Sequence, residues 1–126
     1  MREAISGTLV DGNLLCASAF LIAAQAVTSP LVVGQTADAM DVRVSRCQLG
    51  LFGYGDKRLG QHRIVQTLAT MPPALEAALG ASARDGRVTC EDLWRIAADL
   101  GLPKLTVSGG AETLKLKVVQ CQLGCF

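Results

Sequence analysis

Residues 90–102 read CEDLWRIAADLGL, and this stretch decides the fold of the chain. Its apolar residues recur at helical spacing and predict an amphipathic helix over residues 90–100. They are Cys90, Leu93, Trp94, Ala97 and Leu100. Gly101 and Pro103 then end the helix, because glycine favours a helix end and proline cannot continue a helix. Residues 104–114 predict a second helix, and the alternating residues 115–121 predict a strand.

The same pattern occurs once more, earlier in the chain. Residues 1–52 align with residues 75–126 without a gap, and 16 of the 52 aligned positions are identical. Cys16 falls on Cys90, and Cys47-Gln48-Leu49-Gly50 falls on Cys121-Gln122-Leu123-Gly124. A match of this length indicates an internal duplication. The chain therefore consists of repeat 1 (residues 1–52), a linker (residues 53–74) and repeat 2 (residues 75–126).

Because the two repeats align, equivalent helices and strands are predicted in both. Repeat 1 predicts helices near residues 16–26 and 31–40, and a strand over residues 42–47. Repeat 2 adds a helix over residues 74–83 behind Pro72 and Pro73, and the linker holds a possible strand over residues 63–68. A unit of about 50 residues cannot bury much of its own surface. We therefore expect a mainly α fold in which the two units pack together as one compact domain, related by an approximate two-fold axis.

Composition indicates an ordinary globular protein. Half of the residues are hydrophobic, 18% are charged and the net charge is +1. Any basic surface that binds nucleic acid must therefore be confined to one part of the protein. Residues 14–26 form an apolar run that resembles a secretion signal, but the run recurs in repeat 2 and is interpreted as a core helix. Without an export signal or a membrane span, we expect a cytoplasmic protein whose five cysteines are reduced.

Residues 93–102 and the following helix resemble the helix-turn-helix of winged-helix transcriptional regulators. The resemblance covers residues 90–121 well and residues 16–47 more faintly, because Val27 stands where the turn glycine is expected. It implies two tandem winged-helix-like units, with the strand of residues 116–121 beginning a hairpin wing. It also implies binding of double-stranded DNA, with two half-sites about one helical turn apart.

The helix that should read DNA in repeat 2 offers no strong reader of base edges. Its outward positions are expected near Thr106, Gly109, Gly110 and Thr113. The two glycines indicate either close approach by another backbone or an irregular helix. Repeat 1 offers Gln35 as a reader. Contacts to phosphates are expected from basic side chains: Arg43, Arg46, Lys57, Arg58, Arg63, Lys104, Lys115 and Lys117. The alternative is that these charges only keep the surface soluble, and that the fold serves protein–protein assembly without DNA.

Cysteine chemistry is a third hypothesis. Cys47 and Cys121 lie in the repeated tetrapeptide, and Cys125 follows four residues after Cys121. These thiols are weak candidates for a metal or redox site, but no CxxC spacing is present, and we expect no cofactor. With His62 as the only histidine and no nucleotide fingerprint, the sequence predicts that the protein is not an enzyme.

The comparison of the repeats also predicts a homodimer. The helix of repeat 2 has the charged residues Glu91, Asp92, Arg95 and Asp99 on its polar face. The aligned positions in repeat 1 are Ala17, Ser18, Leu21 and Gln25. Contiguous apolar surface of this kind marks an interaction site. Either the linker covers the face of Ala17, Leu21 and Gln25, or a second molecule does.

Overall fold

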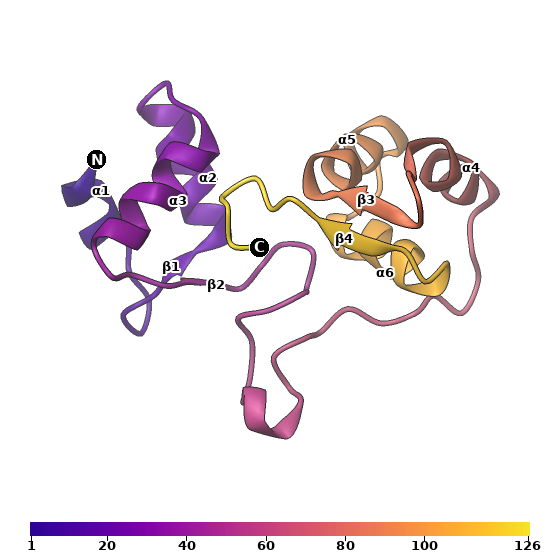
Figure 1. The fold of residues 1–126 in the computed structure, drawn as a ribbon, viewed down its shortest axis with the longest axis horizontal. Helices are drawn as coiled ribbons and strands as arrows, with labels where there is room; N and C mark the ends of the chain where they lie inside the picture. The colour runs from indigo at the N-terminus through magenta and orange to yellow at the C-terminus, as the bar shows by residue number, and fades with distance from the viewer.

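A computed structural model describes all of residues 1–126 and shows two lobes, one for each repeat (Figure 1). Repeat 1 contains α1 (Arg2–Ser6), β1 (Leu14–Leu15), α2 (Cys16–Gln25), α3 (Pro30–Ala39) and β2 (Val44–Ser45). Repeat 2 contains α4 (Pro73–Ser82), β3 (Arg87–Thr89), α5 (Cys90–Leu100), α6 (Lys104–Thr113) and β4 (Lys117–Val119). The linker holds one 3-10 turn, η1 (Lys57–Leu59). The expectation of a mainly α protein with small β elements is confirmed.

The strands differ from the prediction. The two predicted strands are shorter than expected, since only the residues of β2 and β4 pair. Residues 63–68 form no strand. The sequence pattern does not reveal α1 or the short strands β1 and β3. Each of these two strands directly precedes the first helix of its helix pair. Strands of two or three residues carry too little alternation to be recognised by their pattern.

The strand pairing is the same in both repeats and contradicts the expected wing. β1 pairs with β2, and β3 pairs with β4, both in parallel. Leu14 lies beside Val44, and the aligned residues Val88 and Val118 lie beside each other in repeat 2. Parallel neighbours require a crossover connection, which the helix pair supplies in each repeat. β4 therefore closes its own unit in place of beginning a hairpin wing.

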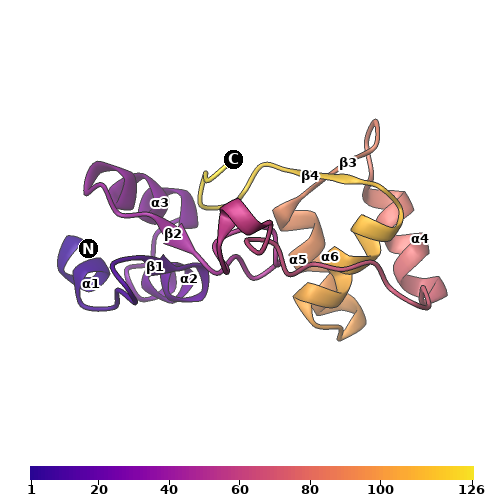
Figure 2. The ribbon, with the colours of Figure 1, turned by 90° about the horizontal axis from the view of Figure 1, so that it is seen from below.

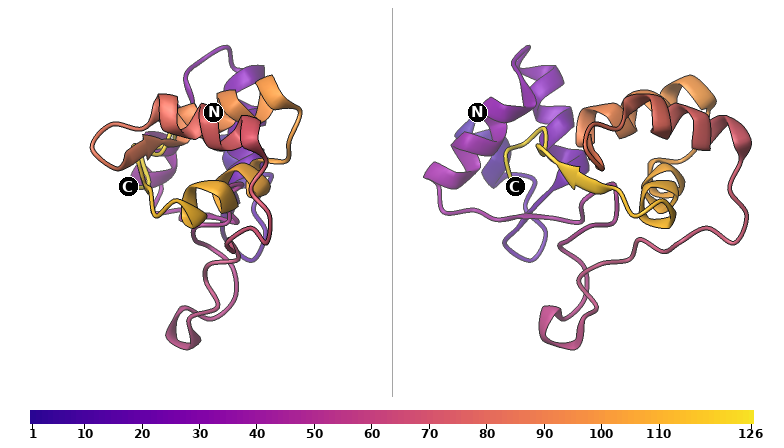
Figure 3. Two further views of the ribbon diagram at one scale, coloured as in Figure 1. Left: turned by 90° about the vertical axis from the view of Figure 1, so that its right-hand side faces the viewer. Right: turned by 45° about the vertical axis from the view of Figure 1, so that its right-hand side comes forward.

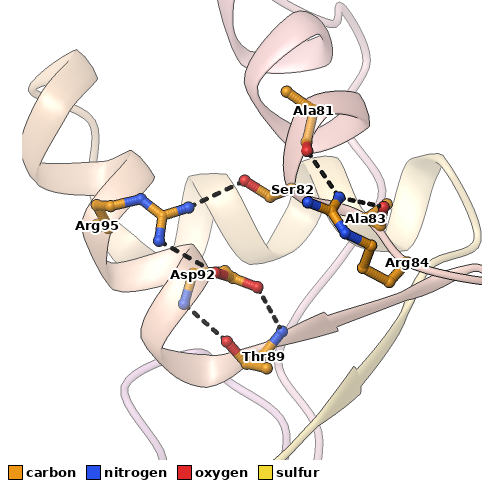
Figure 4. A network of polar contacts seen from close by, with 7 residues as sticks. All are labelled: Ala81, Ser82, Ala83, Arg84, Thr89, Asp92 and Arg95. Atoms are coloured by element: carbon orange, nitrogen blue, oxygen red, sulfur yellow. Dashed lines mark hydrogen bonds and ion pairs between the residues drawn. The ribbon is translucent and has the colours of Figure 1, made fainter.

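Helix α5 is fixed at both ends. The hydroxyl of Thr89 accepts a hydrogen bond from the Asp92 backbone N–H, and the Asp92 carboxylate accepts one from the Thr89 N–H (Figure 4). This reciprocal capping box satisfies two N–H groups that the helix leaves free. Arg95 extends the network, because it pairs with Asp92 at 3.1 Å and donates to the Ser82 hydroxyl at the end of α4. Gly101 ends the helix in the left-handed region, at φ 64°.

Each lobe has its own core, and each core is completed by the other repeat. After β2, the chain of repeat 1 leads Cys47 and Leu49 into the core of repeat 2. After β4, repeat 2 sends Leu123 into the core of repeat 1, where it is 2% exposed. The C-terminal segment is seen crossing to the first lobe in Figures 1 and 2. We call residues 46–52 and 120–126 the exchanged tails.

Two aromatic pairs mark the approximate two-fold axis. The rings of Phe20 and Trp94 lie with centroids 4.1 Å apart, and those of Phe52 and Phe126 meet edge to face at 6.2 Å. Under the alignment of the repeats, each pair consists of a residue and its own equivalent. A residue can contact its own equivalent only close to the axis that relates the two copies. The axis therefore passes between these rings.

No single helix is long and apolar enough to cross a membrane. Only α2 and α3 taken together combine such a length with such a composition, and the chain turns by 114° between them.

Candidate nucleic-acid interface

The linker forms a hairpin between the lobes and borders a cleft on either side. After η1 it runs beneath α6 to reach α4 (Figures 1 and 3). The N–H of Tyr54 donates to the carbonyl of His62 across the hairpin, and the Tyr54 hydroxyl donates to the carbonyl of Cys47 at 2.8 Å. Asp56 accepts a hydrogen bond from the Arg58 N–H at the start of η1. The bond from Tyr54 to Cys47 holds the hairpin against the tail of repeat 1, and the other two bonds fix the hairpin itself.

The cleft on the side of repeat 1, which we call the first cleft, has a volume of about 670 Å³. Arg43 and Arg46 line it from the end of repeat 1, and Lys57 lines it from the linker. All three side chains are exposed and none forms an ion pair. Asp11 is the one carboxylate in the lining. The first cleft therefore carries an excess of positive charge.

The second cleft lies on the side of repeat 2 and has a volume of about 620 Å³. Lys57 and His62 line this cleft as well, so the two clefts adjoin at the hairpin. Lys117 of β4 adds an exposed cation without an acidic partner, and it is the repeat equivalent of Arg43. Arg63 also lines this cleft, but unlike Lys57 and Lys117 it has an acidic partner, since its guanidinium pairs with Glu112 of α6 at 3.0 Å.

Five of the eight basic residues expected to contact phosphates are thus brought together: Arg43, Arg46, Lys57, Arg63 and Lys117. The other three lie elsewhere. Arg58 is exposed on η1 beside Asp56, at 3.6 Å. The ammonium of Lys104 lies over the Trp94 ring, 4.4 Å from its centroid. Lys115 is exposed behind the end of α6, with a left-handed backbone at φ 58°.

The expected outward face of α6 is covered. Gly109 and Gly110 are buried, so the prediction that they point to solvent is wrong. A β carbon on Gly109 would lie 2.7 Å from the carbonyl oxygen of Gln66, because the linker crosses the helix there. The N–H of Leu68 donates to the Thr113 hydroxyl at 2.8 Å and fixes this crossing. Close approach by another backbone is the correct explanation for Gly109, whereas Gly110 packs against the side chains of Leu75 and Leu79 on α4.

Helix α3 of repeat 1 is covered differently. Gln35 is exposed, whereas the neighbouring Gly34 is buried under the tail of repeat 2, at Leu123. On α2, the predicted interface residues Ala17, Leu21 and Gln25 are all exposed, with Leu21 at 60%. The linker lies on α6 and leaves this face of α2 open. The explanation that the linker covers it within the chain is therefore excluded.

The cysteines are all free thiols. Cys16 and Cys90 are buried, and each Sγ accepts a hydrogen bond from the tail glutamine of its own repeat, Gln48 at 3.7 Å and Gln122 at 3.4 Å. Burial raises the pKa of Cys16 to about 11. Cys47 is buried, Cys121 is half-buried and Cys125 is exposed. No group of three or more His, Cys, Asp and Glu side chains is arranged to hold a metal ion.

The structure explains why the Cys-Gln-Leu-Gly segment occurs in both repeats. In each repeat the glutamine contacts the thiol at the start of the first helix of the pair, and the leucine enters the other core. The glycine follows with a left-handed backbone, at φ 74° in Gly50 and 79° in Gly124. The sequence repeat was the only signal for this role, and it could not reveal that the leucine crosses to the other unit.

Sequence reasoning missed three residues of the clefts. They are His62, Ser108 and Phe126. All three line the second cleft. Comparison with protein families, with curated proteins and with solved structures finds no match to this chain.

Proposed function

We propose that the protein binds double-stranded DNA through phosphate contacts made on the face that carries the two clefts. The observation that carries the proposal is the convergence of Arg43, Arg46, Lys57 and Lys117, which come from both repeats and the linker and have no acidic partner. Clustered cations of this kind are what binding to a phosphate backbone requires. A net charge of only +1 restricts the interaction to this face.

The arrangement of the repeats supports the same function. Arg43 and Lys117 are repeat equivalents, so an approximate two-fold axis relates them, and a DNA duplex has two-fold symmetry of its own. The 114° turn between α2 and α3 lies in the range of helix-turn-helix units. These features favour a duplex over an irregular single strand.

Sequence selectivity should be modest. The linker covers the face of α6 that would enter a groove, and the exposed Gln35 of α3 is the remaining candidate for a contact to a base edge. Binding then depends mainly on phosphates, whose positions carry no direct sequence information.

A titration of fluorescent duplex DNA at two salt concentrations tests the proposal. Four phosphate contacts predict a loss of about a hundredfold in affinity when the salt concentration is raised about fourfold. The double variant Arg43→Ala/Lys117→Ala should bind more weakly and depend less steeply on salt. Arg2→Ala is the matched control, because Arg2 is exposed on α1 and lines neither cleft. Absence of binding at low salt, or equal loss in the control, would reject DNA as the ligand.

Assembly with a second copy is the second candidate function, and the open apolar face of α2 favours it. Leu21 is 60% exposed there, next to the exposed Ala17 and Gln25. Contiguous exposed apolar surface is typical of interaction sites. We propose a homodimer with Leu21 near the centre of its interface.

A further inference from the structure

The second cleft is built from four parts of the chain that meet only in the folded protein, one of which is β4 with Lys117. The linker contributes Lys57, His62 and Arg63, α6 contributes Ser108 and Glu112, and the exchanged tails contribute Phe52 and Phe126. Its volume of about 620 Å³ lies within the range of sites for small molecules. The cleft also has side chains of the kinds that such sites combine, namely apolar walls with a few polar groups.

Two buried polar atoms at this cleft lack partners. Ser108 is 1% exposed, and its hydroxyl oxygen has no hydrogen-bond partner. The Nδ1 atom of His62 is likewise buried without a partner. Buried polar groups are almost always paired, because an unpaired one loses its hydration without compensation. Repeat 1 has Gly34 at the position equivalent to Ser108, so this hydroxyl belongs to the cleft of repeat 2 alone.

The charge of the lining favours an anion. Lys57, Arg63 and Lys117 line the cleft with a single acidic side chain, that of Glu112, which is already paired with Arg63. Two ammonium groups therefore remain without a partner. A carboxylate or phosphate in the cleft would receive charge-assisted hydrogen bonds, which are stronger than bonds between neutral groups.

The apolar part of the lining favours a ligand that contains an aromatic ring. Phe52 and Phe126 meet edge to face with centroids 6.2 Å apart, and Phe126 is 49% exposed at the chain end. Leu51, Leu116 and Val118 extend this wall. An aromatic ligand would cover the open side of the pair and gain both burial and favourable ring geometry.

We propose that the second cleft binds a small aromatic anion, with its ring against Phe52 and Phe126 and its anionic group at Lys57, Lys117 and the Ser108 hydroxyl. The site stands on the lining of the cleft and does not require that the protein bind DNA. Lys57 and Lys117 are also among the phosphate contacts assigned above, so a bound anion would compete with DNA for them.

Calorimetric titration of the full chain without DNA tests the site with three probes. 2-Naphthoate has both a ring and a carboxylate, 2-naphthamide has the ring without the charge, and inorganic phosphate has charge without a ring. We expect naphthoate to bind about tenfold more tightly than either of the others. If phosphate binds as tightly as naphthoate, or if naphthoate does not bind, the proposal is wrong.

Two variants locate the binding. Ser108→Ala should weaken naphthoate binding while the protein remains folded, because the hydroxyl it removes makes no bond in the free protein. Lys117→Ala should weaken naphthoate binding in the same way. Lys115→Ala is the control, since Lys115 precedes β4 and lies outside the cleft. Unchanged affinity in both Ser108→Ala and Lys117→Ala would overturn the assignment, whatever the outcome of the DNA titration.

Discussion

The backbone carbonyl of Leu123 lies directly against the α carbon of Gly34, so that the tail of repeat 2 crosses α3 where no side chain fits. The contact seats the Leu123 side chain in the core of repeat 1. The arrangement is reciprocal, because the tail of repeat 1 places Leu49 in the core of repeat 2. Each core therefore includes buried residues from the tail of the other repeat, and the stability of the two lobes is coupled.

Gly34→Ala should destabilise the whole protein strongly. A β carbon at Gly34 would overlap the Leu123 carbonyl, and backbone cannot rotate away as a flexible side chain can. We expect a loss of about 1–3 kcal/mol in the free energy of unfolding, as for other overpacked sites. Chemical denaturation measures the loss.

Gly80→Ala is the control for this prediction, since Gly80 is exposed within α4 and a β carbon there meets no atom within 4 Å. It should stabilise the protein by about 0.5–1 kcal/mol through helix propensity. Equal effects of the two substitutions would show that the tail does not cross α3 as described.

Val27→Gly should stabilise the protein. Val27 is 92% exposed and ends α2 with a left-handed backbone at φ 52°, whereas repeat 2 uses Gly101 at the equivalent position with φ 64°. The left-handed region costs an L-residue about 1–2 kcal/mol, and the greater flexibility of glycine in the unfolded chain offsets part of the gain. We expect the denaturation midpoint to rise by the equivalent of about 1 kcal/mol.

The reverse substitution, Gly101→Val, tests the same turn in repeat 2. The turn is closed by the Leu102 N–H, which donates to the Ala97 carbonyl at 3.0 Å, and the equivalent bond of Thr28 to Ala23 has the same length. Gly101→Val should therefore lower the midpoint by a similar amount. A rise would mean that the two turns do not share one conformation.

Leu21→Arg should convert a dimer into a folded monomer. The substitution copies Arg95, which repeat 2 carries at the equivalent exposed position, and a buried arginine without a partner opposes association. Sedimentation should show a dimer for the natural chain and a monomer with unchanged circular dichroism for the variant. Leu59→Arg, at a residue 68% exposed on η1, should leave the dimer intact. A natural chain that sediments as a monomer at micromolar concentration would exclude the homodimer.

The pair of Cys121 and Cys125 should react with iodoacetamide at neutral pH before the buried thiols Cys16, Cys47 and Cys90. A hydrogen bond from the Cys125 thiol, together with backbone hydrogen bonds, lowers the pKa of Cys121 below its ordinary value despite partial burial. Burial instead raises the pKa values of Cys16, Cys47 and Cys90. The thiolate is the reactive form, so mass spectrometry after brief labelling should find the peptide that contains Cys121 and Cys125 modified first.

Cys125→Ala removes the donor to Cys121 and should slow the labelling of Cys121, with no change at Cys90. If Cys16 or Cys90 reacts first, the surroundings of the thiols are not those described.

The amino-acid sequence by itself determined the local features of this protein. The duplication is legible from 16 identities in an ungapped alignment of 52 positions, and the helix predicted over residues 90–100 is α5, Cys90–Leu100. Helical periodicity, capping residues and proline act within a few residues of each other. Five of the eight basic residues singled out from the sequence line the two clefts, but only the folded chain shows which of them lie together.

Tertiary structure alone decided how the two copies are combined. Nothing local distinguishes a Leu49 that enters its own core from one that enters the core of the other repeat, since the leucine is buried and its turn identical in both cases. The covering of Gly109 by Gln66, the parallel pairing of β3 with β4 and the second cleft likewise join segments far apart in the chain. Such contacts are chosen by the packing of complete surfaces, which a periodic pattern in one segment does not encode.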